Sequence, residues 1–135
     1  MTIQKKLEDL RELFSMFEDR KDQFIQLMDM AKEAGVLSDS EKIDENKIYG
    51  CTSQAWVVPN KNDNQTYTFR TDSDAMIVKG LLTLLENLFN GQKATDICSY
   101  DSQLILKEIG LEGTFSSQRT NGFSNAVEKI KKIIE

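Results

Sequence analysis

The segment SDAMIVKGLLTLLENLFNG, residues 73–91, constrains the fold more than any other part of the chain. Its apolar side chains recur at helical spacing and form one wide face, made of Ile77, Val78, Leu81, Leu82, Leu84, Leu85, Leu88 and Phe89. Polar residues are left for the opposite side, namely Lys79, Thr83, Glu86 and Asn90. Ser73 or Asp74 is predicted to cap the helix start and Gly91 its end. Because so wide a face must be covered by other elements, we expect this to be the central core helix.

Further helices are predicted on both sides of this segment. The first has apolar residues at helical spacing between Ile3 and Phe17, with Thr2 as its N-cap. A second begins near Asp19 and stops at Gly35, so the two are expected to form a hairpin. After the core helix, Thr95 is expected to open a short helical turn and Asp101 a further helix that stops at Gly110, and a terminal helix carries the apolar residues between positions 126 and 134.

The middle of the chain carries strand patterns. Residues 55–58 form a continuous apolar run ended by Pro59, and residues 66–71 alternate aromatic with polar side chains. The stretch NKNDNQ between them is turn material, so an antiparallel hairpin is predicted. Residues 47–49 are a candidate for a third short strand. The predicted fold class is therefore α+β, with a small antiparallel sheet of about three strands packed against several helices.

Length and charge limit the organisation and the partners. A chain of 135 residues with 39% hydrophobic and 29% charged residues fits one domain, residues 1–135, and is too short for two well-packed ones. Lys and Arg number 17 against 22 Asp and Glu, which gives a formal net charge of -5 without a long basic block. Nucleic acid and anionic membranes are therefore not expected as main partners.

The N-terminal stretch MTIQKKLEDLRELF mixes charges among its apolar residues, which argues against a secretory or membrane-spanning segment and favours the cytoplasm. Two cysteines are too few for a disulfide framework. With no histidine, the chain also lacks a ligand set for structural zinc and the usual base of Ser-His and Cys-His hydrolases. We therefore expect no bound metal or cofactor.

The stretch YGCTSQAWVV, residues 49–58, presents one of the two cysteines between a glycine and small polar residues. Gly50 allows a sharp backbone turn, which places Cys51 at a loop tip beside apolar walls such as Trp56. From context alone, a tolerated free thiol is the simpler interpretation. Cys98 lies in ATDICSY beside apolar neighbours, where a small buried hydrophobic residue is expected.

Three motifs favour a role for Cys51. GCTSQAW, DSDAMIVKGL and FSSQRTNGF occur in the order and at a spacing that resemble the SufE family of sulfur-acceptor proteins, over nearly the whole chain. Two departures are visible: Ala55 stands where a larger aliphatic residue usually precedes the tryptophan, and Cys98 has no counterpart among the motifs. The resemblance implies a SufE/IscU-like α+β fold.

The resemblance also implies a function. Members of the family accept sulfur as a persulfide from a SufS-like, pyridoxal-phosphate-dependent cysteine desulfurase, stimulate that enzyme, and pass the sulfur to a downstream scaffold for iron–sulfur cluster assembly. Carried over here, the acceptor is Cys51, and the protein is an accessory carrier whose partner holds the cofactor. The loop and pocket around the acceptor are expected to include Gly50, Ser53, Gln54, Trp56 and Arg119.

Sulfur transfer suits a chain without histidine. A thiolate attacks the outer sulfur of a persulfide and the donor thiolate leaves, so no proton relay is needed. The site needs an accessible sulfur, some stabilisation of the thiolate, and shelter for the product persulfide, which the neighbourhood of Trp56 and Val57 could give. Arg119 follows Ser116 and Ser117 at the start of the last helix, where a guanidinium and free backbone N–H groups could hold an anion. We hypothesise that Arg119 holds the Cys51 loop or its thiolate.

Two other functions stay open at this point. An iron–sulfur scaffold of related architecture would need about three or four ligands, and the chain offers two cysteines far apart. A thiol peroxidase or redox sensor would use Cys51 as the attacked thiol and Cys98 as its resolving partner. The free protein is expected to be a monomer or a weak homodimer.

Overall fold

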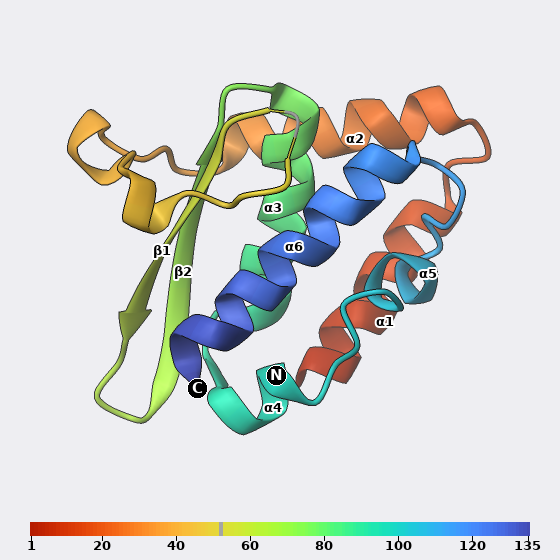
Figure 1. The fold of residues 1–135 in the computed structure, drawn as a ribbon. Coiled ribbons are helices and arrows are strands. Elements are labelled where there is room, and N and C mark those ends of the chain that lie inside the picture. The colour runs from red at the N-terminus through yellow and green to blue at the C-terminus, as the bar shows by residue number, and fades with distance from the viewer. Residues whose placement is uncertain (52) are drawn as a thin grey trace.

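A three-stranded antiparallel sheet packs on a central helix in the computed structural model, which describes residues 1–51 and 53–135 (Figure 1). Strands β1 (Ala55–Lys61), β2 (Thr66–Ser73) and β3 (Gln92–Lys93) lie in the order β1-β2-β3. The β1–β2 hairpin pairs Ala55 with Ser73 at one end and Lys61 with Tyr67 at the other. The predicted α+β class and the small antiparallel sheet are confirmed.

The third strand comes from a different segment than predicted. Lys47 forms only an isolated bridge with Trp56, so the strand expected at residues 47–49 is wrong. β3 instead follows the core helix directly, because Gly91 adopts a φ of 80° and turns the chain back onto the sheet. The N–H of Gly91 donates to the carbonyl oxygen of Tyr67 over 2.7 Å, which fixes the return.

β1 also continues past Pro59, where the apolar run was expected to end. Pro59 pairs with Phe69 of β2, and the strand runs on to Lys61. Proline is tolerated here because β1 is an edge strand, so the missing N–H interrupts no ladder between two neighbours.

Both helices of the predicted hairpin form, but each packs on other helices rather than as a hairpin: the first on α3 (Met76–Phe89) and α5 (Ile105–Ile109), and the second on α3. α1 (Ile3–Ser15) begins where the Thr2 hydroxyl accepts from the N–H of Lys5 over 3.1 Å. α2 (Arg20–Glu33) begins where the Asp19 carboxylate accepts from the N–H of Lys21 over 3.0 Å. The remaining helical segments are two 3-10 turns, η1 (Asp39–Glu41) and η2 (Asp44–Asn46), and α4 (Ala94–Cys98), α5 (Ile105–Ile109) and α6 (Ser117–Ile134). In the part of the chain that the structure describes, no helix is long and apolar enough to cross a bilayer.

The central position of α3 (Met76–Phe89) is confirmed, because it contacts β2 and the helices α1, α2 and α6 (Figure 1). Gly80 permits its close approach to α2. A Cβ at Gly80 would lie 2.6 Å from the carbonyl oxygen of Leu27, so only glycine fits this crossing. The two backbones meet here, and a glycine inside an otherwise apolar helix is the sequence signal for such close packing.

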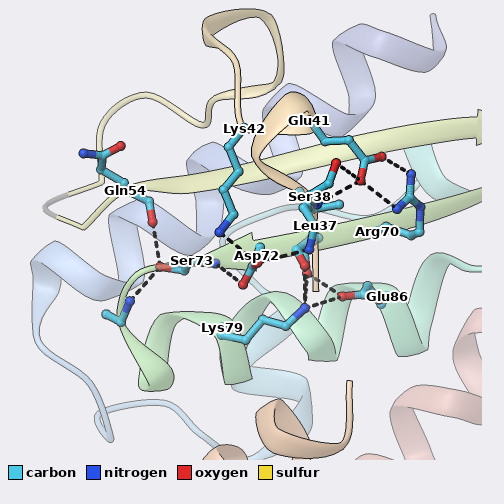
Figure 2. A network of polar contacts seen from close by, with 12 residues as sticks. Leu37, Ser38, Glu41, Lys42, Gln54, Arg70, Asp72, Ser73, Lys79 and Glu86 are labelled. Carbon is cyan, nitrogen blue, oxygen red and sulfur yellow. Dashed lines mark hydrogen bonds and ion pairs between the residues drawn. The ribbon is translucent and has the colours of Figure 1, made fainter. Parts of the chain in front are cut away.

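Lys79 and the start of α3 differ from the prediction. Lys79 was expected on the solvated side but is only 3% exposed, because its ammonium lies 3.3 Å from the Glu86 carboxylate and donates to Thr71 (Figure 2). The residue before α3 is Ala75, which makes no side-chain cap. Ser73 ends β2, and the Asp74 carboxylate binds another segment, so neither is the N-cap.

Candidate functional site

The glycine before Cys51 makes the expected turn. Gly50 has a φ of 87°, a backbone conformation that residues with a side chain rarely adopt. A Cβ there would also clash with the side-chain amide of Asn125 on α6. That amide donates to the Gly50 carbonyl oxygen over 3.4 Å. The turn therefore brings Cys51 directly against α6.

The Cys51 thiol is half-buried and points at the backbone of α6. Its Sγ lies 3.7 Å from the carbonyl oxygen of Gly122, in a weak S–H···O hydrogen bond. A Cβ at Gly122 would lie only 3.1 Å from Sγ, so the absence of a side chain at this helical position makes room for the sulfur. Sequence reasoning assigned Gly122 no role; the glycine inside FSSQRTNGF, in an otherwise helical stretch, was the available signal.

An apolar pocket adjoins the sulfur. It lies between α3 and α6, and its walls are Val78, Leu81, Leu82, Gln118, Arg119, Gly122 and Phe123 together with Cys51. The cavity volume is about 20 Å³. A cavity needs roughly 10–15 Å³ on this measure to hold one water molecule, so the space is large enough for one additional atom beside the sulfur.

Burial sets the charge state of the thiol. It raises the pKa of Cys51 above the ordinary value of 9.0, because the partly apolar surroundings disfavour the thiolate. At neutral pH the thiol in this position is therefore protonated, which matches its donation to Gly122. The thiolate fraction would rise once the sulfur leaves the pocket, because the desolvation is then relieved.

Arg119 lies where the sequence hypothesis needs it, at the wall of the Cys51 pocket. Its N–H donates to the Ser116 hydroxyl over 3.3 Å, which makes Ser116 the N-cap of α6. Desolvation is the cause of the shifted pKa of Cys51 in this arrangement. Stabilisation of the thiolate by Arg119 stays a prediction.

The other flank of Cys51 is anchored through the backbone of Gln54. Its carbonyl oxygen accepts from the Ser73 hydroxyl over 2.7 Å (Figure 2). Its N–H donates to the Asp74 carboxylate over 3.0 Å, and the Asp74 N–H donates to the same carbonyl oxygen over 3.1 Å. The Gln54 side chain is exposed and Ser53 is half-buried. Asp74, which sequence reasoning treated as a helix cap, is thus a structural anchor of the cysteine loop.

Trp56 is not among the residues that line the cavity. It lies on β1 and is 8% exposed, with the Lys42 ammonium 5.4 Å from the ring centroid. Trp56 is therefore a core residue and not a wall of the pocket that holds the thiol. The shelter expected from Trp56 and Val57 comes instead from the side chains of α3 and α6, because these two helices meet beside Cys51.

Cys98 differs from the prediction because it is exposed at the end of α4. The reason is that Ile97, next to it in this short helix, takes the buried position. Figure 1 shows α4 at the end of the molecule away from the start of α6, where the Cys51 pocket lies. A disulfide needs Cα atoms within about 7 Å, so the fold keeps the two thiols of the proposed redox pair apart. Within residues 1–51 and 53–135, no three Cys, Asp or Glu side chains gather as a metal-binding group.

Fold and site together define a small α+β domain that presents one half-buried thiol in a narrow apolar pocket. The family model of SufE, described as an Fe-S metabolism associated domain, matches residues 8–134. The chain belongs to the SufE family, as the three sequence motifs indicated.

Relatives extend over nearly the whole chain. SufE-like proteins from Rhizobium etli and Rhizobium meliloti are 32% and 30% identical, over 93% and 96% of this chain and 87% and 94% of their own lengths. The chloroplastic/mitochondrial SufE-like protein 1 of Arabidopsis thaliana is 30% identical over 94% of this chain but only 34% of its own length. The solution structure of a hypothetical protein from Thermus thermophilus superposes with a TM-score of 0.77 at 17% identity, covering 96% of this chain and 93% of that one, which shows a shared fold.

Proposed function

We propose that the protein accepts sulfur from a pyridoxal-phosphate-dependent cysteine desulfurase as a persulfide on Cys51, stimulates that enzyme, and hands the sulfur on for iron–sulfur cluster assembly. The observation that carries the proposal is the Cys51 thiol beside an apolar space of about 20 Å³, large enough for one more atom. Membership of a family associated with iron–sulfur metabolism supports the same role.

The transfer step balances without an oxidant. The Cys51 thiolate attacks the outer sulfur of the donor persulfide, so one S–S bond forms at Cys51 and the S–S bond in the donor breaks. The electron pair leaves with the donor cysteine, which takes up the proton that Cys51 has lost. The donor enzyme returns to its free thiol, which explains why acceptance would speed its turnover.

The geometry supports a cycle with two positions of the sulfur. Inside the pocket the thiol is neutral and covered, so it reacts slowly with oxidants and with other thiols. To reach a donor, the sulfur must leave the contact with Gly122 and become accessible. After transfer, the side chains of α3 and α6 can shield the persulfide during transport.

The test is sulfur loading by mass spectrometry. Incubation with a SufS-type desulfurase and free L-cysteine should add about 32 Da, one sulfur atom, to the peptide that contains Cys51. Cys98→Ser is the matched control and should load as the unchanged chain does. Cys51→Ser should neither load nor stimulate the desulfurase. If the Cys51 peptide never gains sulfur, or if Cys51→Ser stimulates the enzyme fully, the proposal fails.

The remaining parts of the proposal concern the surroundings. The pyridoxal phosphate belongs to the donor enzyme, and this chain carries the sulfur without a resident cofactor or metal. Binding to the donor must be transient, because a carrier has to leave in order to deliver. The cytoplasm stays the predicted compartment, since its reducing conditions would keep Cys51 free between cycles.

A further inference from the structure

A second hollow lies on the other side of the Gly50 turn. It is lined by one short stretch before Cys51 and by one face of α6, and we call it the basic groove: Lys47, Tyr49, Gly50, Asn125, Glu128, Lys129 and Lys132. Its volume is about 470 Å³, so it is far larger than the cysteine pocket. The α6 residues recur three or four positions apart, which puts them on one side of the helix.

The basic groove carries a formal charge opposite in sign to that of the chain as a whole. Three lysines and one glutamate line it, a formal charge of +2 in a protein of net charge -5. The Glu128 carboxylate lies 3.2 Å from the Ser102 hydroxyl and 3.8 Å from the Lys131 ammonium. Within residues 1–51 and 53–135, no carboxylate forms an ion pair with the three lysines of the groove. Their charges are thus available to a partner.

Tyr49 gives the basic groove an aromatic residue suited to binding. Its side chain is 63% exposed, and the Lys47 ammonium lies 5.6 Å from the ring centroid. Exposed tyrosines beside cations are frequent anchors in protein interfaces, because the ring buries a large area at a small entropic cost. Lys129 is held by a hydrogen bond of 3.0 Å to the carbonyl oxygen of Glu45, which orders this side of the groove before any partner arrives.

The basic groove is continuous with the sulfur site. Gly50 lines the groove and directly precedes Cys51, while Asn125 lines the groove and donates to Gly50. α6 contributes Gly122 to the pocket and Asn125 to the groove, less than one helical turn apart. A partner seated in the groove would therefore press on the turn that presents the thiol.

We propose that the basic groove docks an acidic segment of the persulfide donor, with Tyr49 as the central contact. This inference rests on the proposed function and names the chemistry of the surface that the donor must bring. Three amines are enough to pair with a short run of carboxylates and to steer the encounter of two proteins. A nucleic acid duplex fits less well, because its binding draws on many more phosphate contacts than three amines can make, and the chain as a whole is acidic.

Charge reversal in the basic groove tests the proposal. The triple variant Lys47→Glu/Lys129→Glu/Lys132→Glu is compared with Lys21→Glu/Lys61→Glu/Lys107→Glu, which makes the same charge change at exposed positions outside the groove. We expect the concentration needed for half-maximal stimulation of the desulfurase to rise about tenfold or more for the groove variant only. The half-saturating concentration of the unchanged chain should also rise with ionic strength.

Two further measurements separate the possible failures. Loading of Cys51 from inorganic polysulfide, followed by the gain of about 32 Da, should be equal in both triple variants, which shows that the thiol and the fold are intact. Lys47→Gln/Lys129→Gln/Lys132→Gln should weaken binding less than the reversal does. An unchanged half-saturating concentration in the groove variant, or an equal rise in both triple variants, would overturn the groove proposal. Failure of the unchanged chain to load from the desulfurase would instead overturn the proposed function.

Discussion

Substitution Gly122→Ala tests whether the pocket shields the thiol. The added Cβ would lie 3.1 Å from the Cys51 Sγ, while nonbonded heavy atoms normally pack at about 3.5–4.0 Å, so the sulfur must retreat by about half an ångström. The methyl group also takes up space beside the sulfur. If this contact costs the inward position about 1 kcal/mol, the population with the sulfur outside the pocket rises about fivefold.

The global fold should tolerate this change. Alanine in a helix interior is favoured over glycine by about 0.5–1 kcal/mol, which offsets the strain at the cysteine. We therefore expect the free energy of unfolding to shift by less than about 1 kcal/mol in either direction. The substitution thus alters the site without unfolding the protein.

The assay is the rate of alkylation of Cys51 by iodoacetamide, followed on its peptide in a Cys98→Ser background. We expect Gly122→Ala to react about fivefold faster than the parent at neutral pH, and its persulfide to be reduced faster by added thiol. Gly35→Ala is the matched control, because a Cβ there meets no atom within 4 Å, and it should react as the parent does. An alkylation rate equal to that of the parent, with the substituted chain folded, would refute the reasoning about the pocket.

Three other predictions follow from buried groups. Burial raises the pKa of Cys51, so alkylation of the native chain should reach its half-maximal rate above pH 9.0, whereas the urea-unfolded chain should titrate at an ordinary thiol pKa. The same shift links the free energy of unfolding to pH: the contribution of this group is complete below the unfolded-state pKa and is lost as the pH rises through the folded-state pKa. Gly80→Ala should destabilise by about 1–3 kcal/mol in denaturant unfolding despite the better helix propensity, because the new Cβ meets the carbonyl oxygen of Leu27 at 2.6 Å. Glu86→Gln should lower the free energy of unfolding by about 3–5 kcal/mol, because the charge of Lys79 stays buried without its carboxylate. The double variant Lys79→Met/Glu86→Leu should lose far less stability, and equal losses in the two variants would contradict a role for the ion pair.

Local signals were sufficient for much of the fold. The N-cap Thr2 and the helix start near Asp19 could be predicted because both side chains bond N–H groups two or three residues away, so neighbouring sequence decides the outcome. Gly80 could be interpreted because a glycine inside an apolar helix needs a packing reason. The two long strands were visible as an apolar run and an alternating run separated by turn residues.

Long-range contacts explain what the sequence could not show. Lys79 is buried because its ammonium binds Thr71 on the neighbouring strand β2 and Glu86 further along α3. Helical spacing alone assigns a lysine to solvent. Cys98 is exposed because a five-residue helix can bury only one side, and its direction depends on packing. A strand of two residues, Gln92–Lys93, is too short to leave an alternating pattern.

In the candidate site, too, the locally determined features could be predicted and those set by long-range contacts could not. Cys51 and Gly50 could be found from the motif, because a glycine followed by a cysteine and small polar residues is a local pattern. The walls of the pocket come from α3 and α6, 27 to 72 residues away from Cys51 in the chain, so no local pattern links them to the thiol. For the same reason Trp56, the last residue of the motif GCTSQAW, was assigned to a wall that it does not form.

The edges of the sheet bear on self-association. On one side the chain ends the sheet with a strand of only two residues, and on the other Pro59 removes a donor from the middle of β1 while the bridge from Lys47 covers Trp56. A second copy would find few free backbone groups with which to extend the ladder. The sheet edges therefore disfavour strand-to-strand polymers of this chain.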